Sequence, residues 1–272
     1  MRALLLAAGL GTRLRPLTDH LPKCLVPIHG RPLLDYWLAL LLDHGVEEVL
    51  INTHYMAPLV LQYLDASTWR SRVKVVHEES LAGTGGTLLE NRAFFREETC
   101  LVAHADNLTL FDMADFARCH ALRAKGVEMT MMVFESDDPG SCGIVELDAD
   151  GVVQGFHEKV SQPPGNLANA AVYLVEPPVL DMMAGLGKTQ IDFSTEVIPR
   201  LLGRMGTYCN VRYHRDIGNP RSWMAANRDF PLMPAKAENQ QAWDRIMAQN
   251  NGELARSIDQ FMTDFQTLSQ VR

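Results

Sequence analysis

The sequence predicts an α/β fold: a doubly wound, mostly parallel sheet with a small inserted β subdomain and a C-terminal helical tail. Through the first half of the chain, apolar runs of strand length alternate with helical patterns, which is typical of a parallel sheet covered by helices on both faces. After residue 135 the segments become shorter and more strand-like. Beyond residue 231 a polar segment carries one apolar stripe at helical spacing.

In the first half, the apolar runs of strand length predict strands at residues 3–7, 46–52, 73–77, 100–105 and 127–134. The segments between them have the spacing and end signals of helices, which we expect at residues 33–43, 56–66, 86–95 and 112–125.

The second half predicts a subdomain inserted over the sheet edge, made of short strands at residues 143–147, 152–157 and 170–175. Turn residues at 150–151 and 163–165 separate these strands. Further elements are expected as helices at 177–183, 194–202 and 220–230 and as a strand at 207–213. Pro231 and Pro234 then break the chain, so we expect one main domain of residues 1–230 and a helical extension of residues 231–272.

The extension has its apolar residues four and three positions apart, at Leu254, Ile258, Phe261, Phe265 and Leu268. This places them on one helix face, over too few heptads to indicate a coiled coil. Two docking surfaces are open to this face: the catalytic body, which we expect Phe261 and Phe265 to contact, and a neighbouring subunit in a homo-oligomer.

Composition limits the classes of function. The 272 residues are 47% hydrophobic and 21% charged, with a formal net charge of −8. Such an acidic chain is poorly suited to binding nucleic acid or an anionic membrane. The five cysteines are odd in number and widely spaced, which indicates reduced thiols in a cytoplasmic protein rather than disulfides or a zinc site. The apolar run at the N-terminus is too short for a signal peptide, and no run approaches the length of a membrane span.

The opening stretch, residues 4–16 with Lys23, indicates a polyphosphate site. Gly9 and Gly11 follow an apolar strand, and a glycine loop can bring backbone N–H groups close to an anion. Arg13, Arg15 and Lys23 add positive charge beside it. Leu14 stands where a dinucleotide-binding fingerprint would have its third glycine. Residues 185–189 end like a P-loop, but Met182 stands where the leading glycine is needed, so we interpret them as a helix end and loop.

A set of ordered motifs extends this stretch. Its members are residues 8–16, 22–34, 158–159, 169–173, 192–199 and 216–220. Together they resemble the sugar-1-phosphate nucleotidyltransferases, of the mannose-1-phosphate guanylyltransferase and glucose-1-phosphate thymidylyltransferase types, over roughly residues 1–230. The resemblance implies a Rossmann-like nucleotidyltransferase fold and the transfer of a nucleoside monophosphate from a triphosphate to a sugar-1-phosphate, with release of pyrophosphate.

The resemblance also implies roles for individual residues. Arg13 would steady the departing pyrophosphate, Lys23 would neutralise the α-phosphate, and Asp106 completes the catalytic group. The residues implied in nucleotide binding are Ala8, Gly9, Gly11, Thr12, Arg13, Lys23, Glu78, Gly83 and Asp106. Those implied on the sugar-phosphate side are Gly143, Glu158, Lys159, Asn169 and Asp192.

On the sugar-phosphate side, Lys159 would hold the incoming phosphate. Asp192 could equally cap a helix that begins near Ser194. Mannose-1-phosphate and heptose-1-phosphate are both compatible with these residue types.

Asp106 and Asp216 each end a predicted strand, and the resemblance places the metal ligands at these two positions. Carboxylate oxygens suit Mg²⁺, which accompanies phosphates in such sites. His104 stands where the family often has glycine, and we expect a packed or hydrogen-bonded side chain there rather than a ligand.

The base preference rests on Glu78, in the segment of residues 78–86 that resembles the base-reading loop of the family. A carboxylate only accepts hydrogen bonds, and guanine offers two adjacent donors that it could take in bidentate fashion. This favours GTP. If Glu78 instead faces solvent and backbone groups read the base, UTP or dTTP becomes the expected substrate.

Two other functions compete with this hypothesis. A catalytically silent relative that binds nucleotide sugars and regulates a partner would be expected to have lost some of the reactive side chains, yet Arg13, Lys23, Asp106, Lys159 and Asp216 are all present. A nucleic-acid nucleotidyltransferase is disfavoured by the acidic charge.

Overall fold

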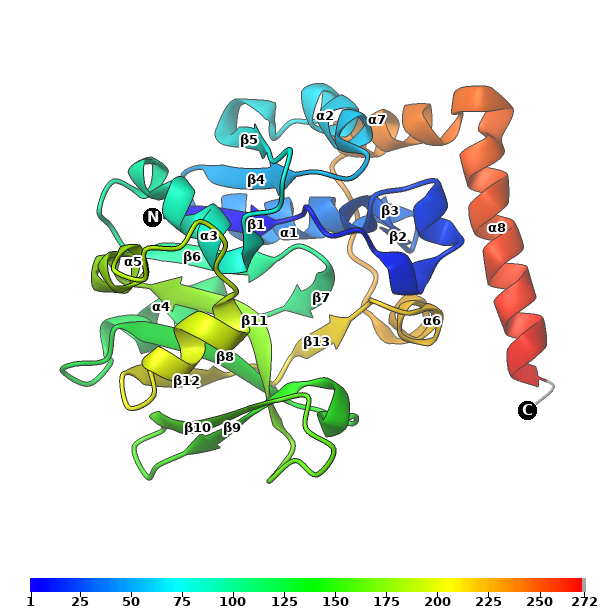
Figure 1. Ribbon diagram of the computed structural model, residues 1–272. Helices are drawn as coiled ribbons and strands as arrows, with labels where there is room; N and C mark the ends of the chain where they lie inside the picture. Colours follow the sequence, from blue (N-terminus) through cyan, green and yellow to red (C-terminus); the bar gives the residue numbers. More distant parts are fainter. Residues whose placement is uncertain (271–272) are drawn as a thin grey trace.

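The computed structural model describes residues 1–270, without the side chains of residues 250–251 and 264–270 (Figure 1). Its central feature is a nine-stranded mixed sheet in the order β10-β9-β11-β6-β1-β4-β5, with β8 joined to β11 and β12. The parallel part consists of β1 (Arg2–Leu6), β4 (Val49–Thr53), β5 (Val73–His77) and β6 (Cys100–His104). The doubly wound sheet that the sequence predicts is therefore confirmed.

Alternation along β1 explains why both faces of the sheet are covered. Ala3 and Leu5 belong to one core cluster, and Leu4 and Leu6 belong to the other. The first cluster lies under helices α1 (Leu33–Leu42), α2 (Ala57–Ala66) and α4 (Met113–Ala121). The second lies under α3 (Gly83–Glu90) and α5 (Pro177–Ala184). Short 3₁₀ turns occur at Thr12–Leu14, Leu17–Asp19, Lys23–Leu25, Arg70–Arg72, Arg92–Phe95, Pro139–Ser141 and Ile198–Arg200.

The strand expected at residues 170–175 lies in the central sheet and not in an inserted subdomain. It is part of β11 (Leu167–Val175), which runs antiparallel to both β6 and β8 (Met129–Glu135). The reason is burial on both faces, because Val172 belongs to one core cluster and Tyr173 to the other. Only the hairpin of β9 (Gly143–Leu147) and β10 (Val153–Glu158) projects from the sheet edge (Figure 1).

Two further expectations are wrong in detail. The single strand expected at 207–213 is two strands, β12 (Met205–Cys209) beside β8 and β13 (Tyr213–Asp216), which pairs with β7 (Asn107–Leu110). The helix expected at 194–202 is a π-helical turn, Phe193–Val197, followed by a 3₁₀ turn. Pro199 lacks the N–H that a continuing helix needs. A short hairpin of β2 (Pro27–Ile28) and β3 (Arg31–Pro32) precedes α1.

The extension packs against the body of its own chain. After α6 (Pro220–Asp229), helix α7 (Ala237–Met247) lies beside α2, and α8 (Gln249–Gln270) runs down one side of the molecule, on the side of β2, β3 and α6 (Figure 1). Phe261 of α8 contacts Trp223 of α6 with ring centroids 5.6 Å apart, as expected. Phe265, the other expected contact, lies outside the described side chains.

Helix α7 is joined to the body by a buried polar cluster centred on Asp35 of α1, which has no exposed surface. One carboxylate oxygen accepts the Trp69 indole N–H at 2.7 Å and the Asn239 amide at 2.8 Å. The other oxygen accepts Arg31 Nε at 2.7 Å. Asn239 thus places a donor of α7 in the core of the catalytic body. Among the helices of residues 1–270, none has the length and apolar character that crossing a bilayer requires.

Candidate active site at the carboxyl ends of the strands

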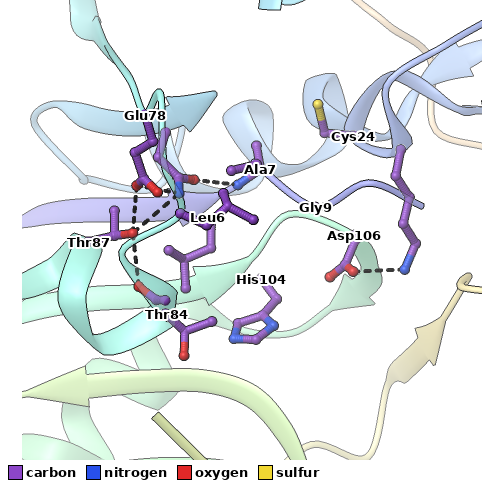
Figure 2. Close-up of a pocket in the computed structure, with 14 residues that line it drawn as sticks. Leu6, Ala7, Gly9, Cys24, Glu78, Thr84, Thr87, His104 and Asp106 are labelled. Carbon is purple, nitrogen blue, oxygen red and sulfur yellow. Dashed lines mark hydrogen bonds and ion pairs between the residues drawn. The ribbon is translucent and has the colours of Figure 1, made fainter. Parts of the chain in front are cut away.

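A pocket of about 170 Å³ opens where β1, β4 and β6 end (Figure 2). It is mainly lined by apolar and small side chains, with polar groups at its two ends. Glu78 and Thr87 lie at one end, and Asp106 lies at the other with the Lys23 ammonium 2.7 Å from it. The residues that line it are Leu6, Ala7, Ala8, Gly9, Lys23, Cys24, Asn52, Glu78, Leu81, Gly83, Thr84, Thr87, His104 and Asp106.

The opening loop depends on glycine at one of its two positions. Gly11 has a φ of +62°, and a Cβ there would lie 2.9 Å from Thr18 Cγ2 and 3.2 Å from Lys23 Cβ. The Thr18 hydroxyl donates to the Gly11 carbonyl at 2.8 Å and so closes the loop. A Cβ at Gly9 would meet nothing within 4 Å, so the space beside its backbone is open to a ligand. Leu14, which excluded the dinucleotide fingerprint, is fully buried and anchors the loop.

Lys23, Asp106 and Asp216 form the charged centre of the site. Lys23 is 5% exposed, and its ammonium lies 2.7 Å from Asp106 Oδ2 and 3.1 Å from Asp216 Oδ1. The two aspartates meet because β13 pairs with β7, and this pairing sets Asp216 opposite Asn107, the residue after Asp106. The structure thus brings these three predicted site residues together, although they are far apart along the chain.

The charge states in this centre follow from burial and pairing. Burial lowers the pKa of Lys23, but Asp106 and Asp216 outweigh it, and the pKa is raised overall. Burial raises the pKa of Asp106, but Lys23 outweighs it, and the pKa is lowered overall. Near neutral pH the centre therefore holds an ammonium between carboxylates.

Arg13 lies beside Asp216 at the mouth of the site. Its guanidinium is 3.6 Å from Asp216 Oδ2, and 70% of its side chain is exposed. An exposed pair of this kind contributes little to stability, so Arg13 is free to turn toward an anion. The close approach of Arg13 and Asp216 requires glycine at position 218, because a Cβ there would lie 2.8 Å from Asp216 Oδ1 and 2.9 Å from the Arg13 guanidinium.

The donor set around Lys23 fits a divalent cation that also binds phosphate. Two carboxylates supply the hard oxygen ligands that Mg²⁺ prefers, and phosphates usually supply others. Within the described part of the chain, no group of three or more His, Cys, Asp or Glu side chains gathers as a complete metal site. Asp106 and Asp216 are the two carboxylates here that could hold such a cation together with phosphate oxygens.

Glu78 is buried at the other end of the pocket and does not face solvent. Its Oε1 accepts the Asn52 amide at 2.9 Å and the Thr87 hydroxyl at 2.6 Å, and its Oε2 accepts the Ala82 N–H at 3.2 Å. The side chain is 7% exposed. With both donors already on Oε1, the bidentate contact expected from the sequence cannot form in this arrangement. Acceptor capacity remains on Oε2.

Two pocket residues beside the charged centre carry shifted pKa values. Burial lowers the pKa of His104, more than the nearby carboxylates raise it, so the ring is neutral near pH 7. Burial raises the pKa of the Cys24 thiol to about 12, so it remains protonated and unreactive.

Gly143, Glu158 and Lys159 come together at the base of the β9–β10 hairpin. A Cβ at Gly143 would lie 2.5 Å from the Phe156 ring and 2.7 Å from Glu158 Oε2. Lys159 follows β10 with a φ of +49°, and its ammonium lies 3.0 Å from Glu158 Oε1. The Lys159 side chain is 65% exposed, so it can reach an incoming phosphate.

Asn169 and Asp192 are both engaged by their own neighbourhoods. Asn169 lies at a register shift in β11, where its amide donates to Tyr173 at 2.7 Å and its carbonyl accepts the Ala171 N–H at 2.9 Å. Asp192 accepts the N–H and the hydroxyl of Thr195 at 2.8 and 2.9 Å, so it caps the π-helical turn. The sugar-side residues lie outside the lining of the pocket described above.

Leu81 and Thr84, which line the pocket, belong to the segment of residues 78–86 that resembles the base-reading loop, whereas Asn52 and Thr87 line it without having been predicted. Asn52 carried a usable signal, since a polar residue ends an otherwise apolar strand at the edge where the site forms. Thr87 carried no such signal, because its position in the pocket depends on how α3 packs. Thr84 accepts the Phe193 N–H at 2.8 Å and thereby joins the pocket to the Asp192 turn.

Comparisons with known proteins agree with this geometry. The sequence model of the nucleotidyl transferase family matches residues 2–231. A mannose-1-phosphate guanylyltransferase of Mycobacterium tuberculosis is 32% identical over 233 residues, which cover 84% of this chain and 64% of that protein. Mannose-1-phosphate guanylyltransferase 1 of Arabidopsis thaliana is 31% identical over 236 residues, with the same two coverages of 84% and 64%.

Solved structures show the same fold. The crystal structure of HddC from Yersinia pseudotuberculosis is 25% identical and superposes with a TM-score of 0.72, covering 85% of this chain and 99% of that chain. The chain spans about 64% of the length of the two curated relatives. Because the family match extends over most of the sequence and the fold agrees with it, the chain belongs to the nucleotidyl transferase family.

Proposed function

We propose that the protein transfers a guanylyl group from GTP to a sugar-1-phosphate of the mannose type, releasing pyrophosphate and forming a GDP-sugar. The observation that carries this proposal is the charged centre, where Lys23 lies 2.7 Å from Asp106 and 3.1 Å from Asp216 beside the glycine loop. A pocket with the volume for a flat ring opens next to it. The activity belongs in the cytoplasm, where both substrates would be met.

The reaction joins two anions, so positive charge must first bring them together. An oxygen of the sugar phosphate forms a bond to the α-phosphorus as the bond between that phosphorus and the pyrophosphate oxygen breaks. Lys23 neutralises the α-phosphate, Arg13 steadies the departing pyrophosphate, and Lys159 holds the sugar phosphate. Such a step depends on positioning and electrostatics, and it requires no covalent intermediate on the protein.

Members of this family generally use a divalent metal ion. We propose Mg²⁺, held by Asp106 and Asp216 together with phosphate oxygens, because carboxylates and phosphates both supply the hard oxygen ligands that this ion prefers. When bound, the ion would neutralise charge on the phosphates. The exposed parts of both carboxylates leave room for it, since their side chains are 35% and 50% exposed.

Two observations support guanine as the base. The curated relatives in Mycobacterium tuberculosis and Arabidopsis thaliana are named as guanylyltransferases. In this chain the buried Glu78 presents a hydrogen-bond acceptor to the pocket. The same relatives are named for mannose-1-phosphate, which we therefore place before heptose-1-phosphate.

The test is a grid of pyrophosphate release with GTP, ATP, UTP and dTTP against mannose-, heptose- and glucose-1-phosphate. The expected result is turnover with GTP and mannose-1-phosphate, dependent on Mg²⁺. A clear preference for UTP or dTTP would overturn the choice of base. Nucleotide binding without pyrophosphate release from any pair would favour the regulatory relative instead.

A further inference from the structure

Glu78 is held in one orientation by neighbours on three different elements. Asn52 comes from the end of β4, Thr87 from α3 and the Ala82 N–H from the loop before α3. Glu78 itself follows β5, and its backbone N–H donates to the Thr53 carbonyl at 2.9 Å. Figure 2 shows Glu78, Thr87 and Ala7 gathered at one end of the pocket.

The direction of each hydrogen bond follows from donor counting. The Asn52 carbonyl accepts the Ala7 N–H at 2.7 Å, so the amide NH₂ of Asn52 must point to Glu78. The Thr87 hydroxyl has one proton, and it lies closer to Glu78 Oε1, at 2.6 Å, than to the Gly83 carbonyl, at 3.0 Å. Two donors therefore occupy Oε1, while Oε2 has only the longer contact to Ala82.

Glu78 Oε2 can distinguish bases by the donor and acceptor groups that lie on either side of the ring N–H. Guanine presents N1–H between its O6 carbonyl and its amino group, so a carboxylate oxygen that lies between N1–H and the amino group meets donors only. Uracil and thymine present N3–H between two carbonyl oxygens, and at least one of these oxygens would approach the carboxylate and be repelled. A buried polar group left without a partner is costly, so the mismatch is expected to be strongly disfavoured.

We propose that Asn52 and Thr87 are positioning residues that set the choice of base by holding Glu78 as a one-oxygen acceptor. This inference rests on the proposed function and adds to it the residues that determine specificity. Asn52 is 3% exposed and Thr87 is 1% exposed, and both donate to Glu78. Their effect on the base is therefore expected to pass through Glu78. Through Ala7, Asn52 also connects base recognition to the end of β1, from which the glycine loop begins.

The test measures dissociation constants for GTP and UTP by calorimetry, without sugar phosphate, in the whole 272-residue chain. Thr87→Val removes a donor from Glu78 while preserving the shape of the side chain. Asn52→Asp keeps the acceptor for Ala7 but turns a carboxylate oxygen toward Glu78. The GTP-over-UTP preference is expected to fall about tenfold or more in both variants, because each loses a hydrogen bond to a charged group. Thr87→Ser, which keeps the hydroxyl, should retain the preference.

The matched control is Thr53→Val, the same substitution at a threonine of equal burial whose hydroxyl donates to the Val76 carbonyl. It should leave the preference unchanged. The inference is overturned if folded Thr87→Val and Asn52→Asp keep the wild-type preference, if Thr53→Val lowers it equally, or if the wild type binds both nucleotides alike. A wild type that prefers GTP but releases no pyrophosphate with any sugar phosphate overturns the proposed function alone.

Discussion

At the scale of single residues, Lys23 is the group on which the site depends. It is buried between Asp106 and Asp216, where its charge offsets theirs. Removing one partner of a buried charge pair is usually more damaging than removing the whole pair, because the remaining charge is left uncompensated. In this centre the charge left behind would be two facing carboxylates.

Lys23→Met should lower kcat/KM by about 100-fold or more, since it removes an electrostatic contact to the reacting phosphate. The same variant should show a melting temperature that Mg²⁺ raises more than it raises that of the wild type, because a cation can replace the lost ammonium. Steady-state kinetics and thermal melts with and without Mg²⁺ measure both effects. Lys74→Met, at an exposed lysine beside Glu48, is the control. Equal responses to Mg²⁺ in all three proteins would contradict this account of the centre.

His214 predicts a pH dependence of stability. Burial lowers its pKa to about 4, more than Asp216 and Asp106 raise it, and its Nδ1 has no hydrogen-bond partner. An unfolded histidine has a pKa of about 6.5. Between these two values the unfolded chain binds a proton that the native chain does not, so stability is present above pH 6.5 and is lost as the pH falls toward 4.

The expected loss is up to about 3 kcal/mol in the free energy of unfolding. Urea denaturation at several pH values measures it. His214→Asn should flatten this part of the profile, whereas the same change at the exposed His20 should not. An unchanged slope in His214→Asn would show that other groups cause the pH dependence.

At the scale of elements, pairing between distant strands assembles the site. Strands β7 and β13 form a small separate sheet, and their register alone brings the two aspartates to one ammonium. Helix α6 begins directly after the Asp216 loop, and its Trp223 donates to the Pro27 carbonyl at 2.8 Å and packs on Phe261 of α8. The segment that holds Asp216 is thus fixed by β7 on one side and by α6, through its contacts with Pro27 and Phe261, on the other.

Phe261→Ala should lower the free energy of unfolding by about 1–3 kcal/mol, below the usual cost for a phenylalanine at the centre of a core, because α8 lies at the surface. Deletion of residues 235–272 should cost more, since it also removes Trp243 and Asn239 from buried positions. Chemical denaturation measures both, with Leu232→Ala at a side chain that is 82% exposed as the control. Sedimentation of the truncated protein tests whether the tail also joins subunits. If truncation alters neither stability nor subunit number, the tail has no structural role.

At the scale of the whole molecule, the sequence predicted what local patterns determine. Continuous apolar runs marked β1, β4 and β6, because a strand buried on both faces needs such a segment. The position of β11 could not be predicted, since its place between β6 and β8 depends on contacts with strands far along the chain. The same holds for the site. Lys23, Asp106 and Asp216 were recognisable as motifs, whereas Thr87 became part of the pocket only through the packing of α3.

The Asp35 cluster has a consequence for how the protein is made. A chain synthesised from its N-terminus contains Asp35, Arg31 and Trp69 long before Asn239 exists. The carboxylate at the centre of this core therefore lacks its Asn239 donor until α7 has left the ribosome. Domains usually fold as units during synthesis, the N-terminal part first. Here the sheet can form early, but the packing of its core is completed only after α7 has been synthesised.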